Sequence, residues 1–454
     1  MPKHKATTQD KPDELSIDLL SLLHGSGDIE IENVTIDIKE LKLRIPISSP
    51  PRATRHMRIS LEPTVPGQQR TEFLVPIIPA PTVRQAPSPP SLAPAPSPSQ
   101  VAELIKTDFK FPTFQYPGSI AEVQIGATGR EGGSRGRTYK IGGAKSLPFW
   151  RFDGVASHLP VVALDTFDLA PPLAKPVKEA YKDVLEDPAA WAKLCVEKYE
   201  ADLPSLHLVG TDPGIKDTSA ADASRLVEDV LQAVDTPIIV GGSGNPQKDM
   251  EVFKKIAEST KGERLIFSSL TTDMDVEKTV RPIIEGNHNL IALAFMDINQ
   301  ARELCRKSQE LGLPRTQLIL DNTTGGLGYG IEYSFSIFQR VRFAALMGEE
   351  VFQVPLSSAS TNAWAAREAW QKPEVVRPAD NIAPVESWGP RELRGPIWEA
   401  TTALILALCG AELFMMMHPL AVKLFREFGK LIAKSQLEKS LKDLQPENWV
   451  EMKV

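Results

Sequence analysis

One unit of sequence recurs eight times between residues 159 and 436: a short apolar strand, a turn rich in Gly, Asp, Ser or Thr, and an amphipathic helix. The strands are predicted at 161–164, 206–209, 237–240, 265–268, 290–294, 317–320, 351–354 and 412–416. Helices with apolar residues at i, i+3 and i+4 are predicted between them, for example at 221–234, 248–258, 298–311 and 331–347. Eight alternations over about 280 residues predict an α/β fold, a (β/α)8 TIM barrel, rather than an open doubly wound sheet.

A β-hairpin is predicted in the segment 106–158, directly before the barrel. Short strands at 123–126 and 138–142 are joined by a Gly- and Arg-rich loop, 129–137. The loop lacks the Gly-Lys-Ser/Thr ending of a phosphate-binding P-loop, and an exposed turn is favoured over an anion site. The hairpin is therefore expected to cap the barrel.

The segments outside the hairpin and barrel differ in composition. Residues 1–60 contain one stretch of helical spacing and two of period-two alternation, which predicts a small helix and hairpin module. Residues 61–105 are assigned to a Pro-rich linker that favours an extended tether. The module either docks a partner or is disordered, and both interpretations stay open. Residues 437–454 are assigned to a C-terminal tail.

The charge pattern excludes some partners. A net charge of −7 gives no basic excess to neutralise phosphates, so nucleic acid is not an expected partner. The chain starts with polar residues, Met1 to Lys5, rather than an apolar signal core, which indicates a cytoplasmic protein. The apolar stretch 403–417 is interrupted by Gly410 and Glu412 and is shorter than a membrane span requires. It is predicted to be a buried helix followed by a buried strand, without membrane contact.

The cysteines limit the metal chemistry of the chain. Cys195, Cys305 and Cys409 lie far apart, and none belongs to a Cys-x-x-Cys pair. Neither a disulfide framework nor a four-cysteine cluster can be built from them. Any iron–sulfur cluster must therefore belong to a partner protein.

In barrels of this kind, functional groups gather on the loops at the C-terminal ends of the strands. The predicted loops are polar, small and rich in glycine, which suits a flat, bulky ligand that approaches the backbone closely. Their Asp, Ser and Thr residues equally suit the capping of the following helices. The sequence has no His-Glu-x-x-His pair, nucleophile elbow, His/Cys cluster or phosphate-binding basic group on these loops. It predicts no catalytic residue and no metal ligated by this chain.

Two histidines lie near predicted strand ends. His207, in Ser205-Leu206-His207-Leu208-Val209-Gly210, invites comparison with the Asp-x-His-x-x-Gly motif of cobalt-ligating proteins, but Ser205 stands in place of the Asp. Its alternating neighbours favour a strand histidine. His418 precedes Pro419 and suits the first turn of the last helix, with a position facing the rim as the alternative.

The turn after the sixth predicted strand carries a long motif, Asp321-Asn322-Thr323-Thr324-Gly325-Gly326-Leu327-Gly328-Tyr329-Gly330-Ile331-Glu332-Tyr333-Ser334. It resembles the small (delta) subunit of the corrinoid/iron–sulfur protein found in acetyl-CoA decarbonylase/synthase complexes. Further agreement lies at 125–128, 142–149, 206–208, 211–213 and 410–419, so the resemblance covers approximately residues 105 to 435. The first 100 residues lie outside it, and Asn322 stands where the family pattern has Pro.

The resemblance implies one subunit of a heterodimer, whose large subunit holds a 4Fe–4S cluster and a corrinoid (cobamide). In the anaerobic acetyl-CoA (Wood–Ljungdahl) pathway, a methyl group would pass from a methyl-pterin, through cobalt, to the nickel centre of acetyl-CoA synthase. This chain would cover the corrin with its rim, exclude water and dock a pterin-dependent methyltransferase, with acetyl-CoA synthase/CO dehydrogenase subunits as further partners. The cofactor-binding residues carried over by position are Thr323, Thr324, Gly325 and Gly326, with Asp212, Ser243, Asn245 and His418 in addition.

Two other functions stay open. One is a stand-alone pterin-dependent methyltransferase, which needs no metal ligand and would hydrogen-bond the pterin edge through Asn245 or Asn322. The other is a scaffold that only holds the complex together, with the N-terminal module and its leash as docking parts. Binding of methyltetrahydrofolate by this chain alone tests the first. Substitution of Thr323 and Thr324 without loss of corrinoid retention or methyl transfer would favour the second.

Overall fold

The computed structural model describes residues 55–61, 71–77, 114–148, 158–371 and 389–437. The chain divides into two compact units, Met1–Phe109 and Lys110–Val454. In the first unit, β1 (Arg55–Leu61) pairs antiparallel with β2 (Thr71–Ile77), with Arg55 opposite Ile77. This pair was not predicted from the sequence, and β2 lies inside the predicted linker 61–105. The residues Thr71-Glu72-Phe73-Leu74-Val75 have high strand propensity, which the composition of the wider segment concealed.

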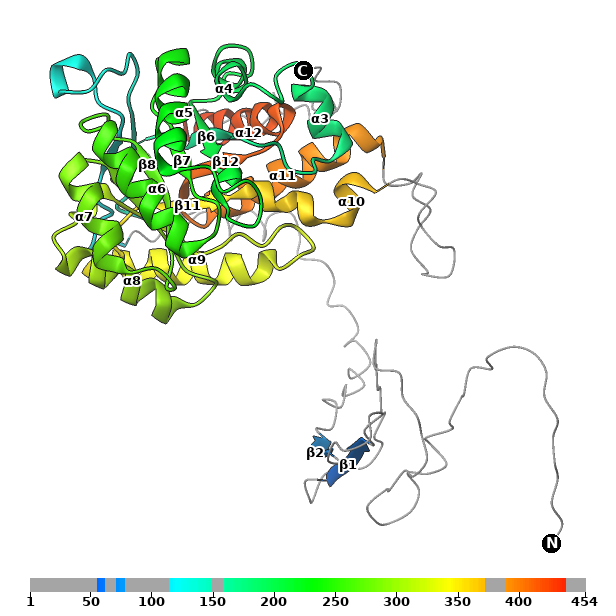
Figure 1. Ribbon diagram of the computed structural model, residues 1–454. Helices are drawn as coiled ribbons and strands as arrows, with labels where there is room; N and C mark the ends of the chain where they lie inside the picture. The colour runs from blue at the N-terminus through cyan, green and yellow to red at the C-terminus, as the bar shows by residue number, and fades with distance from the viewer. Residues whose placement is uncertain (1–54, 62–70, 78–113, 149–157, 372–388, 438–454) are drawn as a thin grey trace, which may run out of the picture. The chain divides into compact units, whose positions relative to one another are not determined.

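The second unit contains a closed barrel of eight parallel strands in the order β10-β11-β12-β5-β6-β7-β8-β9 (Figure 1). The strands are β5 (Val161–Phe167), β6 (Leu203–His207), β7 (Ile239–Gly241), β8 (Ile266–Leu270), β9 (Asn289–Leu293), β10 (Leu318–Asp321), β11 (Leu356–Ala359) and β12 (Ala411–Met416). The predicted (β/α)8 barrel is confirmed. The predicted segment boundaries at residues 60, 105, 158 and 436 stay predictions.

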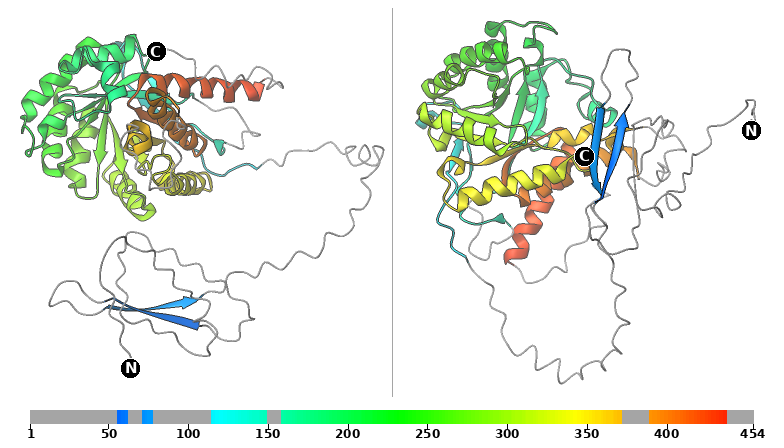
Figure 2. Two further views of the ribbon diagram at one scale, coloured as in Figure 1. Left: turned by 90° about the vertical axis from the view of Figure 1, so that its right-hand side faces the viewer. Right: turned by 90° about the horizontal axis from the view of Figure 1, so that it is seen from below.

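Helices surround the strands (Figure 2). They are α3 (Lys175–Tyr181), α4 (Pro188–Glu197), α5 (Ala220–Ala233), α6 (Pro246–Ser259), α7 (Val276–Gly286), α8 (Ile298–Glu310), α9 (Ile331–Leu346), α10 (Arg367–Trp370), α11 (Arg391–Leu408) and α12 (Pro419–Leu437). Short 3-10 turns are η1 (Gly129–Glu131), η3 (Val209–Thr211), η4 (Arg315–Gln317), η5 (Glu350–Phe352) and η6 (Ser360–Ala365). Capping side chains that accept a hydrogen bond from the first turn begin α4 to α8: Asp187, Ser219, Asn245, Asp275 and Asp297.

One predicted strand is wrong. Residues 351–354 belong to η5 and the turn after it, and the seventh barrel strand is β11, which begins at Leu356. Phe352 and Val354 are fully buried, so their apolar character reflects burial beneath the barrel wall rather than pairing in the sheet. A short apolar run does not distinguish these two states.

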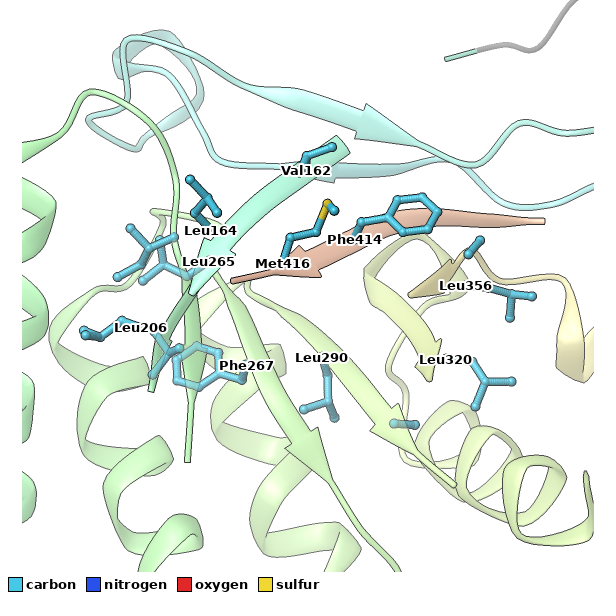
Figure 3. Close-up of a cluster of buried hydrophobic side chains, with 14 of the residues drawn as sticks. Val162, Leu164, Leu206, Leu265, Phe267, Leu290, Leu320, Leu356, Phe414 and Met416 are labelled. Atoms are coloured by element: carbon cyan, nitrogen blue, oxygen red, sulfur yellow. The ribbon is translucent and has the colours of Figure 1, made fainter. Parts of the chain in front are cut away.

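Alternation along the strands separates two layers of packing. In β5, Val161 and Ala163 belong to the cluster inside the barrel, whereas Val162 and Leu164 pack against the helices. Figure 3 shows the outward-facing set, with Val162, Leu164, Leu206, Leu265, Phe267, Leu290, Leu320, Leu356, Phe414 and Met416 labelled. Continuous apolar strands of this kind are typical of a parallel sheet that is buried on both faces.

The predicted hairpin is formed by β3 (Val123–Ile125) and β4 (Tyr139–Ile141). Val123, Ile125 and Ile141 are fully buried in the cluster inside the barrel. The amide of Gly126 donates to the carbonyl of Arg264 at 2.8 Å, just before β8 begins. The hairpin therefore closes the N-terminal end of the barrel and leaves the C-terminal end as the accessible one.

The apolar stretch 403–417 forms the end of α11 and all of β12, as predicted. Within the described ranges, no helix combines the length and apolar character needed to cross a bilayer.

Candidate functional site at the barrel mouth

The C-terminal mouth of the barrel is lined by polar and small residues. They are Asp165, Ser205, His207, Gly241, Ser268 and Asp321, each two or four positions after a residue of the cluster inside the barrel on the same strand, and Ser357, which pairs with Asp321 across β10 and β11. The side chains of His207, Ser268 and Leu293 keep partial solvent exposure. The mouth is therefore open to solvent, unlike the hairpin end.

Asp165 and His207 form an ion pair across β5 and β6. His207 Nε2 lies 2.9 Å from Asp165 Oδ1, and the ring stacks on Phe167 at 5.1 Å. Asp165 is 1 % exposed, whereas the His207 side chain is 28 % exposed. Burial lowers the pKa of His207, but the charge of Asp165, the hydrogen bond to it and the charge of Asp168 outweigh burial, so the pKa lies above its ordinary value.

This pair was not predicted from the sequence. The predicted position of His207 on a strand is confirmed, but no partner for its ring was predicted. The available signal was that Asp165 directly follows the predicted strand 161–164 and that His207 lies on the next predicted strand, 206–209. Ends of adjacent parallel strands meet at one edge of the sheet, so these side chains come together.

Asp321 belongs to a second set of hydrogen-bonded polar residues at the mouth. Its Oδ2 accepts a hydrogen bond from Ser357 Oγ at 3.1 Å, and its Oδ1 accepts from the amide of Thr323 at 2.8 Å. Burial raises the pKa of this carboxyl to about 6, against the lowering effect of both bonds. The hydroxyls of Thr324 and Ser358 lie 2.9 Å apart. These contacts fix the start of the motif loop, residues 321–334.

Most of the predicted cofactor-binding residues in the motif loop have partners within the chain. Thr324, Gly325 and Gly326 are buried. The amide of Gly325 donates to Ser334 Oγ at 2.8 Å, and that hydroxyl donates to the carbonyl of Thr323 at 2.9 Å. Only Thr323 among the four keeps partial exposure. The structure thus gives the buried three a role in shaping the loop.

Thr323 has an unusual backbone conformation, with φ at +64°. A β-branched residue seldom adopts this left-handed region, because Cβ crowds the backbone. The hydrogen bond from Thr323 Oγ1 to the carbonyl of Ala294, at 3.0 Å, helps to hold it there. Conformations of this kind gather at functional sites, where the surroundings stabilise them.

Asn322 is fully buried, and neither Nδ2 nor Oδ1 has a hydrogen-bond partner in the part of the chain that the structure describes. A buried amide without partners costs about 1 to 3 kcal/mol. Both polar atoms of the side chain are therefore enclosed within the described part of the chain without a hydrogen bond.

Asp212, Ser243 and Asn245 lie on the loops after β6 and β7, away from the motif loop after β10. Asp212 Oδ1 accepts from the amide of Gly214 at 2.6 Å, and Asn245 Oδ1 caps α6 through the amide of Lys248 at 3.1 Å. These residues are partly exposed, so their local roles leave some polar surface open to a ligand. The structure does not bring the predicted set together at one point.

His418 is 6 % exposed and directly precedes α12, which agrees with a helix-start histidine. Its ring stacks on Trp364 at 5.9 Å, and its Nδ1 accepts from the amide of Leu420 at 3.1 Å. Burial lowers its pKa to about 4, and the backbone of Pro176 only partly opposes this effect. His418 is therefore neutral at physiological pH.

Glu399, on α11, was not found from the sequence. It is fully buried, and its Oε2 accepts from Trp364 Nε1 at 3.0 Å and from the amide of His418 at 3.1 Å. Its Oε1 accepts from the amide of Met417. Burial raises its pKa to about 8, although these donors favour the charged form. Glu399 thus joins α11 to the end of β12 and to η6.

A cleft of about 410 Å³ opens beside this cluster. It is lined by Pro171, Pro172, Leu173, Ala174, Val177, Trp364, Trp370 and Met417. Its walls come from the segments after β5, β11 and β12, which are neighbours in the barrel. The cleft is apolar, in contrast to the mouth.

No group of three or more His, Cys, Asp or Glu residues able to hold a metal ion occurs within the described ranges. The three cysteines are buried and free. Burial raises the thiol pKa of Cys305 and Cys409 to about 12, which disfavours the thiolate that metals bind.

Comparison with known proteins gives a consistent family match. The family model described as CO dehydrogenase/acetyl-CoA synthase delta subunit matches residues 122–383. The acetyl-CoA decarbonylase/synthase complex subunit delta of Archaeoglobus fulgidus is 44 % identical over 371 residues, covering 81 % of this chain and 80 % of the relative. The corresponding subunit of Methanothermobacter thermautotrophicus is 38 % identical over 434 residues, covering 95 % and 96 %.

Among solved structures, a dihydropteroate synthase from Xanthomonas albilineans matches with a TM-score of 0.40 at 12 % identity, covering 62 % of this chain and 95 % of that chain. A dihydropteroate synthase from Coxiella burnetii matches with a TM-score of 0.40 at 11 % identity, with the same coverage.

Proposed function

The chain belongs to the CO dehydrogenase/acetyl-CoA synthase delta subunit family, and from this premise we propose that it is the small subunit of a cytoplasmic corrinoid/iron–sulfur methyl carrier. The observation that carries the proposal is the family match itself, with 38 % identity across nearly the whole of a relative named as a subunit of the acetyl-CoA decarbonylase/synthase complex. The large corrinoid/iron–sulfur subunit is its proposed direct partner. A pterin-dependent methyltransferase and the acetyl-CoA synthase/CO dehydrogenase subunits are the further ones.

The proposed role is to cover the corrinoid that the large subunit holds. When bound, the corrinoid supplies a cobalt centre that carries a methyl group from a methyl-pterin towards acetyl-CoA synthase. The chain's own part is to exclude water and to hydrogen-bond the periphery of the macrocycle. Thr323, Asp212, Ser243 and Asn245 are suited to this because each is partly exposed.

Two features support the fit of this rim to a corrinoid. The rim offers small polar groups around an open mouth, so a wide, flat ligand can approach the backbone. Thr323, the partly exposed residue of the motif loop, sits in a backbone conformation that its hydrogen bonds hold in place. The cobalt ligands and the cluster ligands belong to the large subunit in this proposal.

The first test is to co-express the chain with its candidate large subunit, purify the proteins anaerobically and compare the ultraviolet-visible corrinoid spectrum of the pair with that of each chain. A stable pair that contains corrinoid, with none bound by this chain alone, is the expected result. Two chains that do not associate would contradict the proposal.

Thr323→Ala is expected to weaken corrinoid retention by the pair about tenfold, the effect of losing one well-placed hydrogen-bonding group. Thr316→Ala is the matched control, since Thr316 is exposed in η4 at the opposite end of the same strand. Corrinoid released during gel filtration, measured by absorbance, gives the comparison. Equal retention by both variants and the wild type would favour the scaffold function instead.

A further inference from the structure

The outward face of α9 exposes large apolar side chains. Helix α9 runs along the outside of the barrel (Figure 1). Tyr333 is 65 % exposed, Phe343 48 % and Met347 46 %, whereas Phe338 and Val341 on the inward face are fully buried. Apolar side chains that gather on one exposed face are typical of a surface that binds another protein. The outward face of α9 is therefore a candidate docking surface.

The exposed residues form one stripe along the helix. Each member follows the one before it by three or four positions, and because an α-helix has 3.6 residues per turn, this spacing places the helical members on one side. The stripe consists of Tyr329, Glu332, Ser336, Arg340, Phe343 and Met347. Ser336 keeps partial exposure and the others are exposed. We call these six residues the α9 stripe.

Both ends of the α9 stripe are aromatic. At the C-terminal end, the ring of Tyr116 lies edge-on to Phe343 at 6.4 Å, and Phe114 lies edge-on to Tyr116 at 4.8 Å. At the N-terminal end, Tyr329 and Tyr333 are exposed. The polar members of the stripe lie between these two aromatic ends.

The two charged members of the α9 stripe are placed symmetrically about Ser336. Glu332 lies four positions before it and Arg340 four positions after it, which is about one helical turn in each direction. Among the charged residues of α9, only Arg342 forms an ion pair within the described part of the chain, with Glu412. The stripe therefore presents opposite charges at equal distances from a small residue.

We propose that the α9 stripe docks a second copy of this chain, with the two α9 helices antiparallel and crossing at Ser336. In this arrangement Glu332 of each copy faces Arg340 of the other, and Phe343 faces Tyr329, because residues at equal distances from the crossing point meet. A two-fold axis makes every such contact twice. The small side chain of Ser336 lets the helices approach closely at the crossing.

The charges of the α9 stripe favour a second copy as its occupant. A stripe with charge of one sign would repel its own copy, whereas this one is complementary to itself. The helix has 16 residues and is about 24 Å long, so the stripe buries less than the roughly 800 Å² per partner of a standard interface. A dissociation constant in the micromolar range is therefore expected. The inference does not depend on the proposed function.

Charge reversal tests the proposed pairing. Sedimentation velocity is measured on the full chain, alone and paired with its large subunit, at about 1 to 100 µM. Arg340→Glu is expected to weaken self-association about tenfold, because it sets like charges against each other at both ends of the crossing. The double variant with Glu332→Arg and Arg340→Glu exchanges the charges and should restore association.

Arg306→Glu is the matched control for the charge reversal. Arg306 is an exposed arginine on the neighbouring helix α8, where it pairs with Glu310 at 2.7 Å. It lies outside the α9 stripe, so its reversal should leave self-association unchanged.

A disulfide at the crossing point tests the geometry. Ser336→Cys places the same residue of both copies at the two-fold axis, and mild oxidation should join the copies covalently. The three native cysteines are buried, so they do not compete for the cross-link. Ala221→Cys, at an exposed position of α5, is the control that should stay monomeric.

Three results would overturn the proposal. The first is a chain that stays monomeric up to about 100 µM, both alone and in the pair. The second is a double variant that associates no better than Arg340→Glu. The third is loss of self-association on pairing, with the Ser336→Cys thiol shielded from a thiol reagent, which would assign the stripe to the large subunit instead. Retention of corrinoid by the pair is measured separately, so these results leave the proposed function untouched.

Discussion

Glu399→Ala is expected to lower the free energy of unfolding by about 3 to 5 kcal/mol. The substitution leaves three buried donors without an acceptor, namely the indole N–H of Trp364 and the amides of Met417 and His418. Each such donor costs about 1 to 3 kcal/mol when water does not reach it. The expected loss is less than the sum of three full costs because the local structure can relax around the substitution. Guanidinium chloride unfolding, followed by far-ultraviolet circular dichroism, measures the loss.

Glu399→Gln separates the hydrogen bonds from the charge. The amide keeps the shape but turns an NH₂ group towards one donor, so a smaller loss of about 1 to 2 kcal/mol is expected. A loss from Glu399→Ala no larger than this would contradict the assigned role of Glu399 as an acceptor for three segments.

The stability of the wild type is expected to depend on pH more strongly than that of Glu399→Gln. The reason is the raised pKa of Glu399, which is about 8 in the folded state against an ordinary value of 4.5. Between these values the folded chain retains a proton that the unfolded chain has lost. The contribution of protonated Glu399 to the free energy of unfolding is therefore fully present below the ordinary pKa of 4.5 and is lost as the pH rises through about 8. Wild type should lose stability relative to Glu399→Gln across this window, by up to about 1 kcal/mol per pH unit. A constant difference from pH 5 to 8 would show that Glu399 is already ionised.

Gly325→Ala is expected to destabilise the chain by about 3 kcal/mol, because its Cβ would lie 2.6 Å from the backbone carbonyl of Gly330. Gly326→Ala should have a similar effect, since its Cβ would lie 2.8 Å from Ala363 Cα. Neither contact can be relieved by a side-chain rotation. Thermal unfolding of each variant measures the cost.

Gly129→Ala is the control for the glycine substitutions, because no atom beyond the adjacent residues lies within 4 Å of a Cβ placed there. Its effect should stay within about 0.5 kcal/mol. If Gly325→Ala and Gly129→Ala unfolded alike, the tight packing of the motif loop would be refuted. A destabilised loop should also release corrinoid from the pair, since the motif loop positions Thr323.

The motif loop identifies the family, but its sequence does not give the role of each of its residues. Its residues carry the resemblance to the delta subunit family, and the family match agrees with it. The structure gives several of these residues a packing role: Gly325 and Gly326 lie against backbone, and Thr324 bonds Ser358. Corrinoid contact by Thr323 stays a prediction. A motif marks where a family retains its residues, but it does not say whether ligand contact or packing requires them.

The residues missed from the sequence are those whose partners lie far along the chain. Asp165 and His207 are separated by 42 positions, and Glu399 meets Trp364 across 35. No local spacing rule connects such pairs. Only folding brings them together: β5 pairs with β6, and α11 packs against η6.

The sequence by itself determined the barrel, because strand and helix periodicities are local and the eightfold alternation leaves few topologies. It also determined the family through a contiguous motif. Only the tertiary structure decided which polar residues share the mouth, which are buried as packing, and which retain an open hydrogen-bonding position. The reason is physical: the pKa and accessibility of a group depend on the dielectric environment and on neighbours that folding supplies from distant parts of the chain.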